Sequence, residues 1–415
     1  MYLGLDFGTG GARACVIDES GSVTFANRYD YSNSEQQTPA DWREALHFLL
    51  KSLPTGIASG ISRIALDATS SSVLLCDADL EPVSPVLLYN DARALAQADQ
   101  LASLAPDGHV VLSANSGLSK FLWLTQHITP AHAAHFMHQA DWLSALLTGN
   151  GGMSDYHNAL KSGYDAEKLC WPDWILQLPH SHLLPHVLTP GEPIAEISET
   201  NAIHFGLKKA CTIHAGTTDS IAAFIAADIH HPGTAVTSLG TTMVLKLLSA
   251  TRVEVSKFGI YSHRYGNLWL TGGASNAGGG VLRQHFTDTR LLELSRQIDC
   301  ATDSELDYYP LPRKGERFPC YDPELLPRLT PRPDDDARFL HGILQGLSKI
   351  ERDGYALLAQ HNATPLRKVF TVGGGAKNSC WTQIRQRLLG VPISVPQHTE
   401  AAYGSALLAR NTAVV

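Results

Sequence analysis

Two segments of this 415-residue chain share one design, a Gly-Thr turn between two strands of alternating apolar residues. The first reads YLGLDFGTGGARACVI at residues 2–17, and the second reads TAVTSLGTTMVLKLLS at residues 234–249. Such alternation around a glycine turn predicts a β-hairpin. Because Gly240 lies 232 positions after Gly8, we expect two related halves rather than a series of short repeats.

The rest of the sequence alternates between strand and helix patterns, which indicates an α/β protein with mixed sheets. The proline-rich stretch 309–333 predicts an ordered connector or a lid, and a domain boundary is expected within 221–236. Apolar spacing predicts helices over 40–53, 93–104, 117–127, 139–148 and 334–360, strands within 61–77 and over 368–374, and a further helix from about residue 378.

Composition narrows the class of protein. The length suits two or three domains, and a net charge of −8 gives no field that would attract nucleic acid or an anionic membrane. Seven cysteines without a CxxC pair argue against a disulfide framework or a zinc ribbon and suit a reducing compartment. No apolar run is long enough to predict a transmembrane helix. We therefore expect a cytoplasmic enzyme whose partners include neither nucleic acid nor membrane.

Each Gly-Thr turn is a candidate phosphate site. Backbone amides and a hydroxyl converge there, and glycine lets the backbone approach an anion closely. A single turn of this kind is weak evidence and is more often a tight β-turn without chemistry. Two such turns, one in each half, favour a pair of loops that hold one polyphosphate. Asp6, directly before the first turn, is then a candidate carboxylate for orienting a metal ion.

A third glycine stretch, TVGGGAKNSCWTQIRQRLLG at residues 371–390, follows a predicted buried strand. Its three glycines fit the close approach of a nucleotide. Asn378 and Trp381 are three residues apart, so both can face the same side of a first helical turn. Trp381 could offer a flat face to a base, and the alternative is that it packs in the core.

Asp219, in HAGTTDSIAAF at residues 214–224, is the candidate base. It stands among small residues at the start of an apolar helix, where it is either a helix N-cap or a base close to phosphoryl transfer. With Asp6, Thr9 and Thr241 it could supply the positioning, charge neutralisation and proton acceptance that this reaction needs. Histidines at 132, 135 and 138 recur every three residues and are expected to spread around a helix, so they predict no metal site.

Taken together, these segments resemble the motifs of the FGGY carbohydrate kinases. LDFGTGGAR is similar to the first phosphate motif of that family, SLGTTMVL to its second, VGGGAKN to its adenosine motif and AGTTDS to the segment that carries the catalytic base. KFLWLTQH and YPLPRKGERFP resemble two further signatures, and the motifs run from residue 3 to about residue 405 in family order. Within the family, QADWL, SDYHNALK and TEAAYG resemble the short branch of D-ribulose kinase and xylulose-kinase-like proteins.

The resemblance implies an α/β fold of the two-domain actin/hexokinase/Hsp70-like (ribonuclease H-like) ATPase type, with a cleft between the domains. Residues 1–228 would form the N-terminal domain, with the sugar site, the first phosphate hairpin and the catalytic aspartate. Residues 229–415 would form the C-terminal domain, with the second phosphate hairpin and the adenosine site. ATP and Mg²⁺ are the implied cofactors, the implied partners are a small sugar and ATP, and the implied state is a monomer or homodimer.

The resemblance also assigns roles to residues. Asp219 would be the base, supported by Asp6 and Thr9, and Asp6 would orient the metal through water. The implied sugar-binding residues are Asp6, Asp67, Ser70, Asp91, Arg93, Asp219 and Ser220. The implied nucleotide-binding residues are Gly8, Thr9, Gly10, Gly11, Arg13, Gly240, Thr241, Thr242, Gly373, Gly374, Gly375, Asn378 and Trp381.

Substrate choice depends on DATSSS at residues 67–72. This stretch resembles the ribulose- and pentitol-kinase side of the family, and differs from the N-Q-R of glycerol kinases and the Q-M-H-G of xylulokinases. The resemblance therefore implies conversion of D-ribulose to D-ribulose 5-phosphate, with a D-xylulose or pentitol kinase, or an inactive sensor, as alternatives. Asp91 and Arg93 resemble sugar-facing residues, although Tyr89 replaces a common tryptophan; a surface ion pair is the other interpretation.

Overall fold

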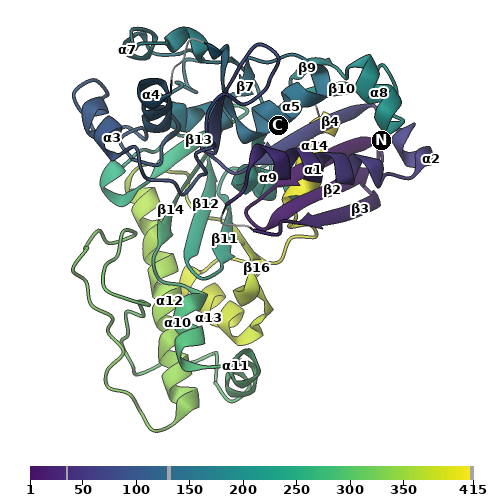
Figure 1. The fold of residues 1–415 in the computed structure, drawn as a ribbon. Helices are drawn as coiled ribbons and strands as arrows, with labels where there is room; N and C mark the ends of the chain where they lie inside the picture. Colours follow the sequence, from purple (N-terminus) through teal and green to yellow (C-terminus); the bar gives the residue numbers. More distant parts are fainter. Residues whose placement is uncertain (34–35, 129–131, 412–415) are drawn as a thin grey trace. The chain divides into compact units, whose positions relative to one another are not determined.

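The structure is a computed structural model that describes residues 1–33, 36–128 and 132–411 (Figure 1). The chain divides into two compact units. The first consists of Met1–Asp228 together with the chain from His398 onward, and the second consists of Ile229–Gln397. The sequence analysis expected residues 229–415 to form the second domain, whereas in this division the chain from His398 onward groups with the first unit.

The first unit is built on a six-stranded sheet of order β3-β2-β1-β4-β10-β9. Strands β1 and β2 form the first hairpin, and β4 and β10 continue the sheet parallel to β1. Its helices and strands are β1 (Tyr2–Phe7), β2 (Gly11–Ile17), β3 (Val23–Asp30), α1 (Pro39–Lys51), α2 (Thr55–Ala58), β4 (Arg63–Ala68), β5 (Val73–Cys76), α3 (Leu95–Leu101), α4 (Gly117–His127), β6 (His135–His138), α5 (Gln139–Thr148), β7 (Met153–Asp155), α6 (Tyr156–Ala159), η2 (Leu160–Ser162), α7 (Asp173–Leu176), η3 (Ser181–Leu183), β8 (His186–Leu188), β9 (Pro193–Glu196), α8 (Glu199–Phe205), β10 (Thr212–Thr218), α9 (Asp219–Ala226) and α14 (Ala401–Asn411).

The C-terminal helix α14 belongs to the first unit because it packs against β1, β4 and α9 (Figure 1). Two polar contacts fix it there. The Tyr403 hydroxyl donates to the Gly21 carbonyl at 3.1 Å, and the Ser405 hydroxyl donates to the Asp67 carboxyl at 2.6 Å. Helix α14 therefore completes the packing of the first unit against the strands of the first hairpin.

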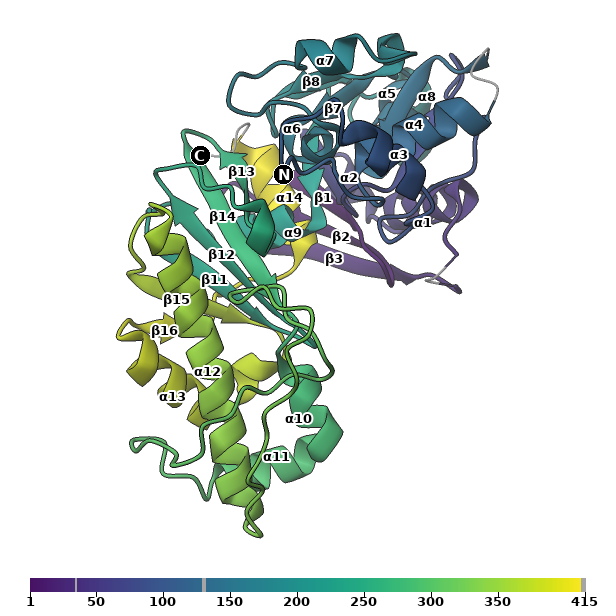
Figure 2. The same ribbon diagram turned by 90° about the vertical axis from the view of Figure 1, so that its left-hand side faces the viewer.

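The second unit repeats this plan with a sheet of order β13-β14-β12-β11-β15-β16. The 25-residue helix α12 packs on β12, β14 and α13 (Figure 2). Its helices and strands are β11 (Thr234–Leu239), β12 (Met243–Ser249), η4 (Ser256–Phe258), β13 (Tyr261–Tyr265), β14 (Leu268–Ser275), α10 (Gly279–His285), α11 (Asp288–Ser295), α12 (Asp336–Gln360), β15 (Lys368–Val372), η5 (Gly374–Lys377), α13 (Ser379–Leu389) and β16 (Ile393–Ser394).

The two units share the arrangement that the paired hairpins predicted. In each, an antiparallel hairpin (β1–β2 or β11–β12) is followed by parallel strands beside its first strand, β4 and β10 in one unit, β15 and β16 in the other. The predicted helices are confirmed to within a few residues, and the C-cap that follows α5 is Gly149, in the left-handed conformation with φ 80°.

Two other expectations have different outcomes. The helix expected around the histidines at 132, 135 and 138 is wrong, because His135–His138 forms strand β6, paired with β5. The connector over 309–333 is ordered, as predicted. Buried Glu316 ties it down by accepting bonds from the Ser275 hydroxyl at 2.6 Å and the Asn276 amide at 2.8 Å. Among the described residues, no helix is long and apolar enough to cross a membrane.

Candidate functional site

The candidate residues of the first unit gather where its parallel strands end. In the sheet, Asp6 of β1 stands beside Asp67 of β4, and Asp67 stands beside Thr217 of β10. Because β1, β4 and β10 are parallel, their carboxyl ends share one edge, which is where open α/β sheets place their ligands. The first hairpin turn, the loop at Ser70 and the start of α9 all follow from this edge.

The first turn presents its backbone at the surface. The Gly8 amide donates to the Gly11 carbonyl at 3.1 Å, and Thr9 and Gly10 between them are exposed. Gln37 supports the loop by donating to the Thr9 carbonyl at 2.7 Å. A side chain at Gly11 would place its Cβ 2.2 Å from the Tyr29 carbonyl of β3, so only glycine fits. The motif glycines thus shape a loop suited to an anion.

Asp6 lies directly behind this turn and is 3% exposed. Its carboxylate accepts a bond from Arg13 of β2 at 2.9 Å, and Arg13 also lies 3.6 Å from Glu400. Burial raises the pKa of Asp6, while the hydrogen bonds from Asp67 and Arg13 oppose the rise. Asp6 is therefore a buried carboxylate held in one orientation beside a candidate phosphate loop.

Asp67 is fully buried, which differs from the sugar-binding role expected for it. It accepts a hydrogen bond from the Ser405 hydroxyl at 2.6 Å, and Asp6 is its neighbour on the adjacent strand. Burial, followed by the neighbouring charge of Asp6, raises its pKa well above the ordinary value. We infer that Asp67 keeps its proton and supports Asp6 from behind, because no surface of its side chain is open to a sugar.

A protonated Asp67 makes stability depend on pH. Its pKa is raised in the folded state, so the folded protein holds a proton that the unfolded chain releases above pH 3.8. The stability that this proton confers is present below that pH and is lost as pH rises through the folded-state pKa. We predict that Asp67→Asn removes this component from the pH dependence of unfolding by urea. An unchanged profile in the variant would contradict a protonated Asp67.

Asp219 is the first residue of α9, directly after β10, and Thr218 is the N-cap. The N-cap alternative for Asp219 is therefore wrong. Its carboxylate is half-buried and accepts a bond from the Ser220 amide at 2.6 Å, and Ser220 itself is exposed. A negative charge is favoured at a helix N-terminus. The arrangement keeps a carboxylate at the same sheet edge as Asp6, and the charge of Asp219 also acts on Asp67.

The segments expected to face the sugar lie near this edge. Ser70 is half-buried in the loop after β4. Asp91 and Arg93 form an ion pair at 2.8 Å, and Arg93 also lies over the Trp123 ring, 5.2 Å from its centre. Asp91 and Arg93 line a pocket of about 490 Å³, and Gln37 is part of the same lining. The ion-pair interpretation is thus correct, and the pocket keeps a sugar-facing role open as a proposal.

In the second unit, the turn at Gly240, Thr241 and Thr242 is held by the start of α10. The Gly240 and Thr241 carbonyls accept bonds from the Gly279 and Gly280 amides at 2.8 and 3.0 Å. Arg283 of α10 donates to the Thr241 hydroxyl at 2.7 Å. The sequence analysis did not identify this exposed guanidinium. The available signal was the three consecutive glycines at 278–280, which resemble the other glycine loops.

The glycine loop at residues 373–375 lies at the same edge of the second sheet as this turn, because β11 and β15 are parallel and end together. Gly373 has φ 85°, and a Cβ there would lie 2.8 Å from the Leu239 carbonyl. Gly374, exposed, has nothing within 4 Å of such a Cβ. The two glycine loops of this unit are thus neighbours through Leu239, the last residue of β11.

Asn378 and Trp381 do share the first turn of a helix, but both have structural partners. Asn378 is the N-cap of α13: its side chain accepts from the Trp381 amide at 3.0 Å and donates to Ser295 at 2.9 Å. The Trp381 ring is 1% exposed, and its indole N–H donates to Ser348 of α12. Stacking of Trp381 on a base is therefore not supported, because the core covers its ring.

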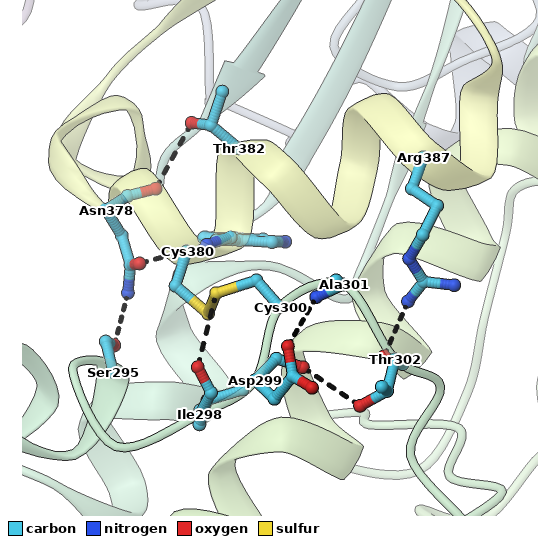
Figure 3. Close-up of a disulfide and its surroundings, with 11 residues drawn as sticks. Ser295, Ile298, Asp299, Cys300, Ala301, Thr302, Asn378, Cys380, Thr382 and Arg387 are labelled. Atoms are coloured by element: carbon cyan, nitrogen blue, oxygen red, sulfur yellow. Dashed lines mark hydrogen bonds between the residues drawn. A yellow bond between two sulfur atoms is a disulfide. The ribbon is translucent and has the colours of Figure 1, made fainter.

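A disulfide joins Cys300 to Cys380 beside this cap (Figure 3). The two residues are 80 positions apart, with Cα atoms 5.6 Å from each other. The wide spacing of cysteines had argued against a disulfide framework, and for this pair the expectation is wrong. The loop after α11 returns to the start of α13, which is also where Ser295 meets Asn378 (Figure 3).

Comparison with known proteins bears on the whole chain. The sequence model for the N-terminal domain of the FGGY family of carbohydrate kinases matches residues 1–226, and that for its C-terminal domain matches residues 235–413. A xylulose kinase of Streptomyces coelicolor is 27% identical over 447 residues, which cover 98% of this chain and 86% of the relative. A D-ribulokinase of Saccharomyces cerevisiae is 22% identical over 512 residues, which cover 98% of this chain and 71% of that relative.

Solved structures agree in fold. A xyloylose kinase from Brucella ovis has a TM-score of 0.86 at 23% identity, covering 99% of this chain and 91% of that one. A glycerol kinase from Plasmodium falciparum, solved with ADP, has a TM-score of 0.83 at 16% identity, covering 99% and 89%. These likenesses confirm the expected two-domain actin/hexokinase-like fold.

Proposed function

This chain belongs to the FGGY family of carbohydrate kinases, which are phosphotransferases with an alcohol acceptor, and we propose that it transfers the γ-phosphate of ATP to the terminal hydroxyl of a pentulose. The preferred substrate is D-ribulose, phosphorylated at O5. The observation that carries the proposal is the common sheet edge at which Asp6, the first glycine turn and Asp219 follow from parallel strands.

Asp219 acts as the base for the attacking hydroxyl. It is half-buried and fixed at the start of α9, so its carboxylate keeps one position relative to the sheet. The hydroxyl that attacks must lose its proton as the bond to phosphorus forms, and a carboxylate within hydrogen-bond reach accepts it. Backbone amides of the glycine turns in each unit neutralise charge on the phosphates.

The residues of the first unit also fit a magnesium ion. Mg²⁺ is usually held by one or two carboxylates together with phosphate oxygens and waters rather than by a full protein cage. Asp6 offers one such carboxylate, because it directly precedes the first turn and is held in one orientation by Arg13. Asp6 would hold the ion through water, and the bound ion would neutralise charge on the β- and γ-phosphates.

The choice of D-ribulose depends on residues 67–72. Thr69 bonds to Ser72 at 2.6 Å and to Gln139 at 2.7 Å, which gives this loop a fixed shape in which Ser70 remains half-buried. The names of the relatives divide between xylulose kinase and D-ribulokinase, so D-xylulose is the competing substrate. Hydroxyl contacts discriminate strongly between such sugars when the protein groups that make them are buried.

ADP release with Mg²⁺-ATP tests the proposal across D-ribulose, D-xylulose, L-ribulose, ribitol, glycerol and a control without sugar. We expect kcat/KM to be highest with D-ribulose. A higher value with D-xylulose or ribitol would keep the mechanism and change the substrate. Tight ATP binding without turnover on any of them would identify a sensor and overturn the kinase.

Arg283 gives a prediction specific to the nucleotide side. Its exposed guanidinium beside Thr241 can form charge-assisted bonds to a phosphate, so Arg283→Ala should raise the KM for ATP about tenfold and leave the sugar KM unchanged. Arg290→Ala is the matched control, because Arg290 is an exposed arginine of α11 paired with Glu293. Equal KM values for ATP in the two variants would remove Arg283 from the phosphate site.

A further inference from the structure

Lys120 of α4 is fully buried, yet no carboxylate lies within ion-pair distance of it in the described parts of the chain. Its ammonium instead donates to two backbone carbonyls, that of Ser71 at 2.8 Å and that of Leu88 at 2.7 Å. Buried ammonium groups are costly and are usually paired with an acid. A buried lysine whose ammonium is bonded to backbone carbonyls, without an acidic partner, therefore suggests a specific role for that charge.

The two carbonyls belong to the two segments that are proposed to face the sugar. Ser71 lies in DATSSS, next to Ser70, and has a left-handed backbone with φ 67°, which is strained for a residue other than glycine. Leu88 directly precedes the segment that carries Asp91. A further bond, from the Tyr89 amide to the Ser72 hydroxyl at 3.0 Å, joins the same two segments.

We propose that Lys120 is a positioning residue for the sugar, whose ammonium clamps the loop at Ser70 to the segment at Asp91. The inference rests on the proposed function, because it concerns the sugar side of that site. A bond from an ammonium is about twice as strong as one between neutral groups, so the clamp holds best when Lys120 is charged. Strained Ser71 is kept in place by the same contact.

The surroundings of Lys120 set the pH at which the clamp weakens. Burial lowers the pKa of Lys120 from 10.5 to about 7; the Asp91 carboxylate opposes the fall and the Lys161 ammonium of η2 adds to it. Arg93 pairs with Asp91. Two other elements that pack against α4 carry titratable groups. On α3 the group is Asp99, which is exposed, and on β5 it is the buried thiol of Cys76, whose pKa is raised to about 12. Lys120 should lose its charge as pH rises through about 7.

The test compares Lys120→Met with Thr125→Val. Thr125 is a buried polar residue of the same helix, and among the described residues its hydroxyl donates only to the Phe121 and Leu122 carbonyls of that helix, so its loss controls for disturbance of α4. We expect Lys120→Met to raise the KM for D-ribulose at least tenfold at pH 6.5, with the KM for ATP within about twofold of wild type. Thr125→Val should change neither value. A folded Lys120→Met enzyme with an unchanged sugar KM would overturn the inference.

The pH profile of wild type keeps the test decisive even where Lys120→Met does not fold. We expect the sugar KM of wild type to rise between pH 6 and 8.5 while the KM for ATP stays level, because only the sugar segments depend on Lys120. A level sugar KM over this range would overturn the inference and leave the kinase intact. Absence of turnover by wild type with every sugar would instead overturn the proposed function, and the inference with it.

Discussion

Replacement of Asp219 by alanine should lower kcat for sugar phosphorylation by about 10²- to 10⁴-fold, the usual contribution of a positioned general base. The carboxylate at the start of α9 is the group proposed to accept the proton of the attacking hydroxyl. Because nucleotide binding is assigned to other residues, the affinity for ATP should stay within about twofold. Initial rates of ADP release with saturating D-ribulose, together with calorimetric titration of ATP, measure both quantities.

A matched control for this variant is Glu199→Ala. Glu199 is also an acidic residue in the first turn of a helix of the first unit, α8, and it is paired with Lys209 at the surface. It has no place in the candidate site, so its loss should leave kcat unchanged. Near wild-type turnover in Asp219→Ala would show that the base is misassigned, whatever the control does.

The largest effect on stability is expected from Glu351→Ala in the second unit. Glu351 of α12 and Arg385 of α13 form an ion pair at 2.6 Å in which neither side chain is exposed. Glu351 also accepts from Thr237 of β11, and Arg385 donates to Thr371 of β15, so four elements meet at this pair. Removing one partner strands a buried charge, which should cost about 3–5 kcal/mol of unfolding free energy. Urea unfolding measures the loss.

Two further variants separate this explanation from a general loss of packing. Replacing both Glu351 and Arg385 by methionine should recover most of the stability, because a buried ion pair exchanged for apolar side chains is often neutral. Glu305→Ala breaks an exposed pair with Arg338 and should cost about 1 kcal/mol or less. A Glu351→Ala variant as stable as Glu305→Ala would contradict the role given to the buried pair.

The parts of the fold and of the site that the sequence predicts are those that depend on short stretches of neighbouring residues. Alternation around Gly8 and Gly240 predicts both hairpins, and small residues before an apolar helix place Asp219 at a strand-to-helix junction. The roles of the residues in catalysis and binding remain proposals. They depend on the resemblance of motifs, which the sequence shows, and on the shared sheet edge, which comes from the pairing of β1, β4 and β10 and is visible only in the structure.

The expectations that failed depend on contacts between residues far apart in the chain. Asp67 is covered by Ser405, 338 positions later, and no local pattern could have shown that burial. Trp381 follows Asn378 at the spacing expected for a binding pair, but the same spacing suits core packing, and Ser348 of α12 decides the outcome. Cys300 and Cys380 likewise meet only through the return of a loop to the start of α13.

The most direct test of the central claim is the fate of the phosphate in a reaction with D-ribulose labelled with ¹³C at carbon 5. After incubation with the wild-type enzyme and Mg²⁺-ATP, the account predicts that the labelled carbon resonance splits through coupling to phosphorus, in proportion to the ADP formed. Formation of ADP with free inorganic phosphate and an unsplit resonance would contradict sugar phosphorylation at O5.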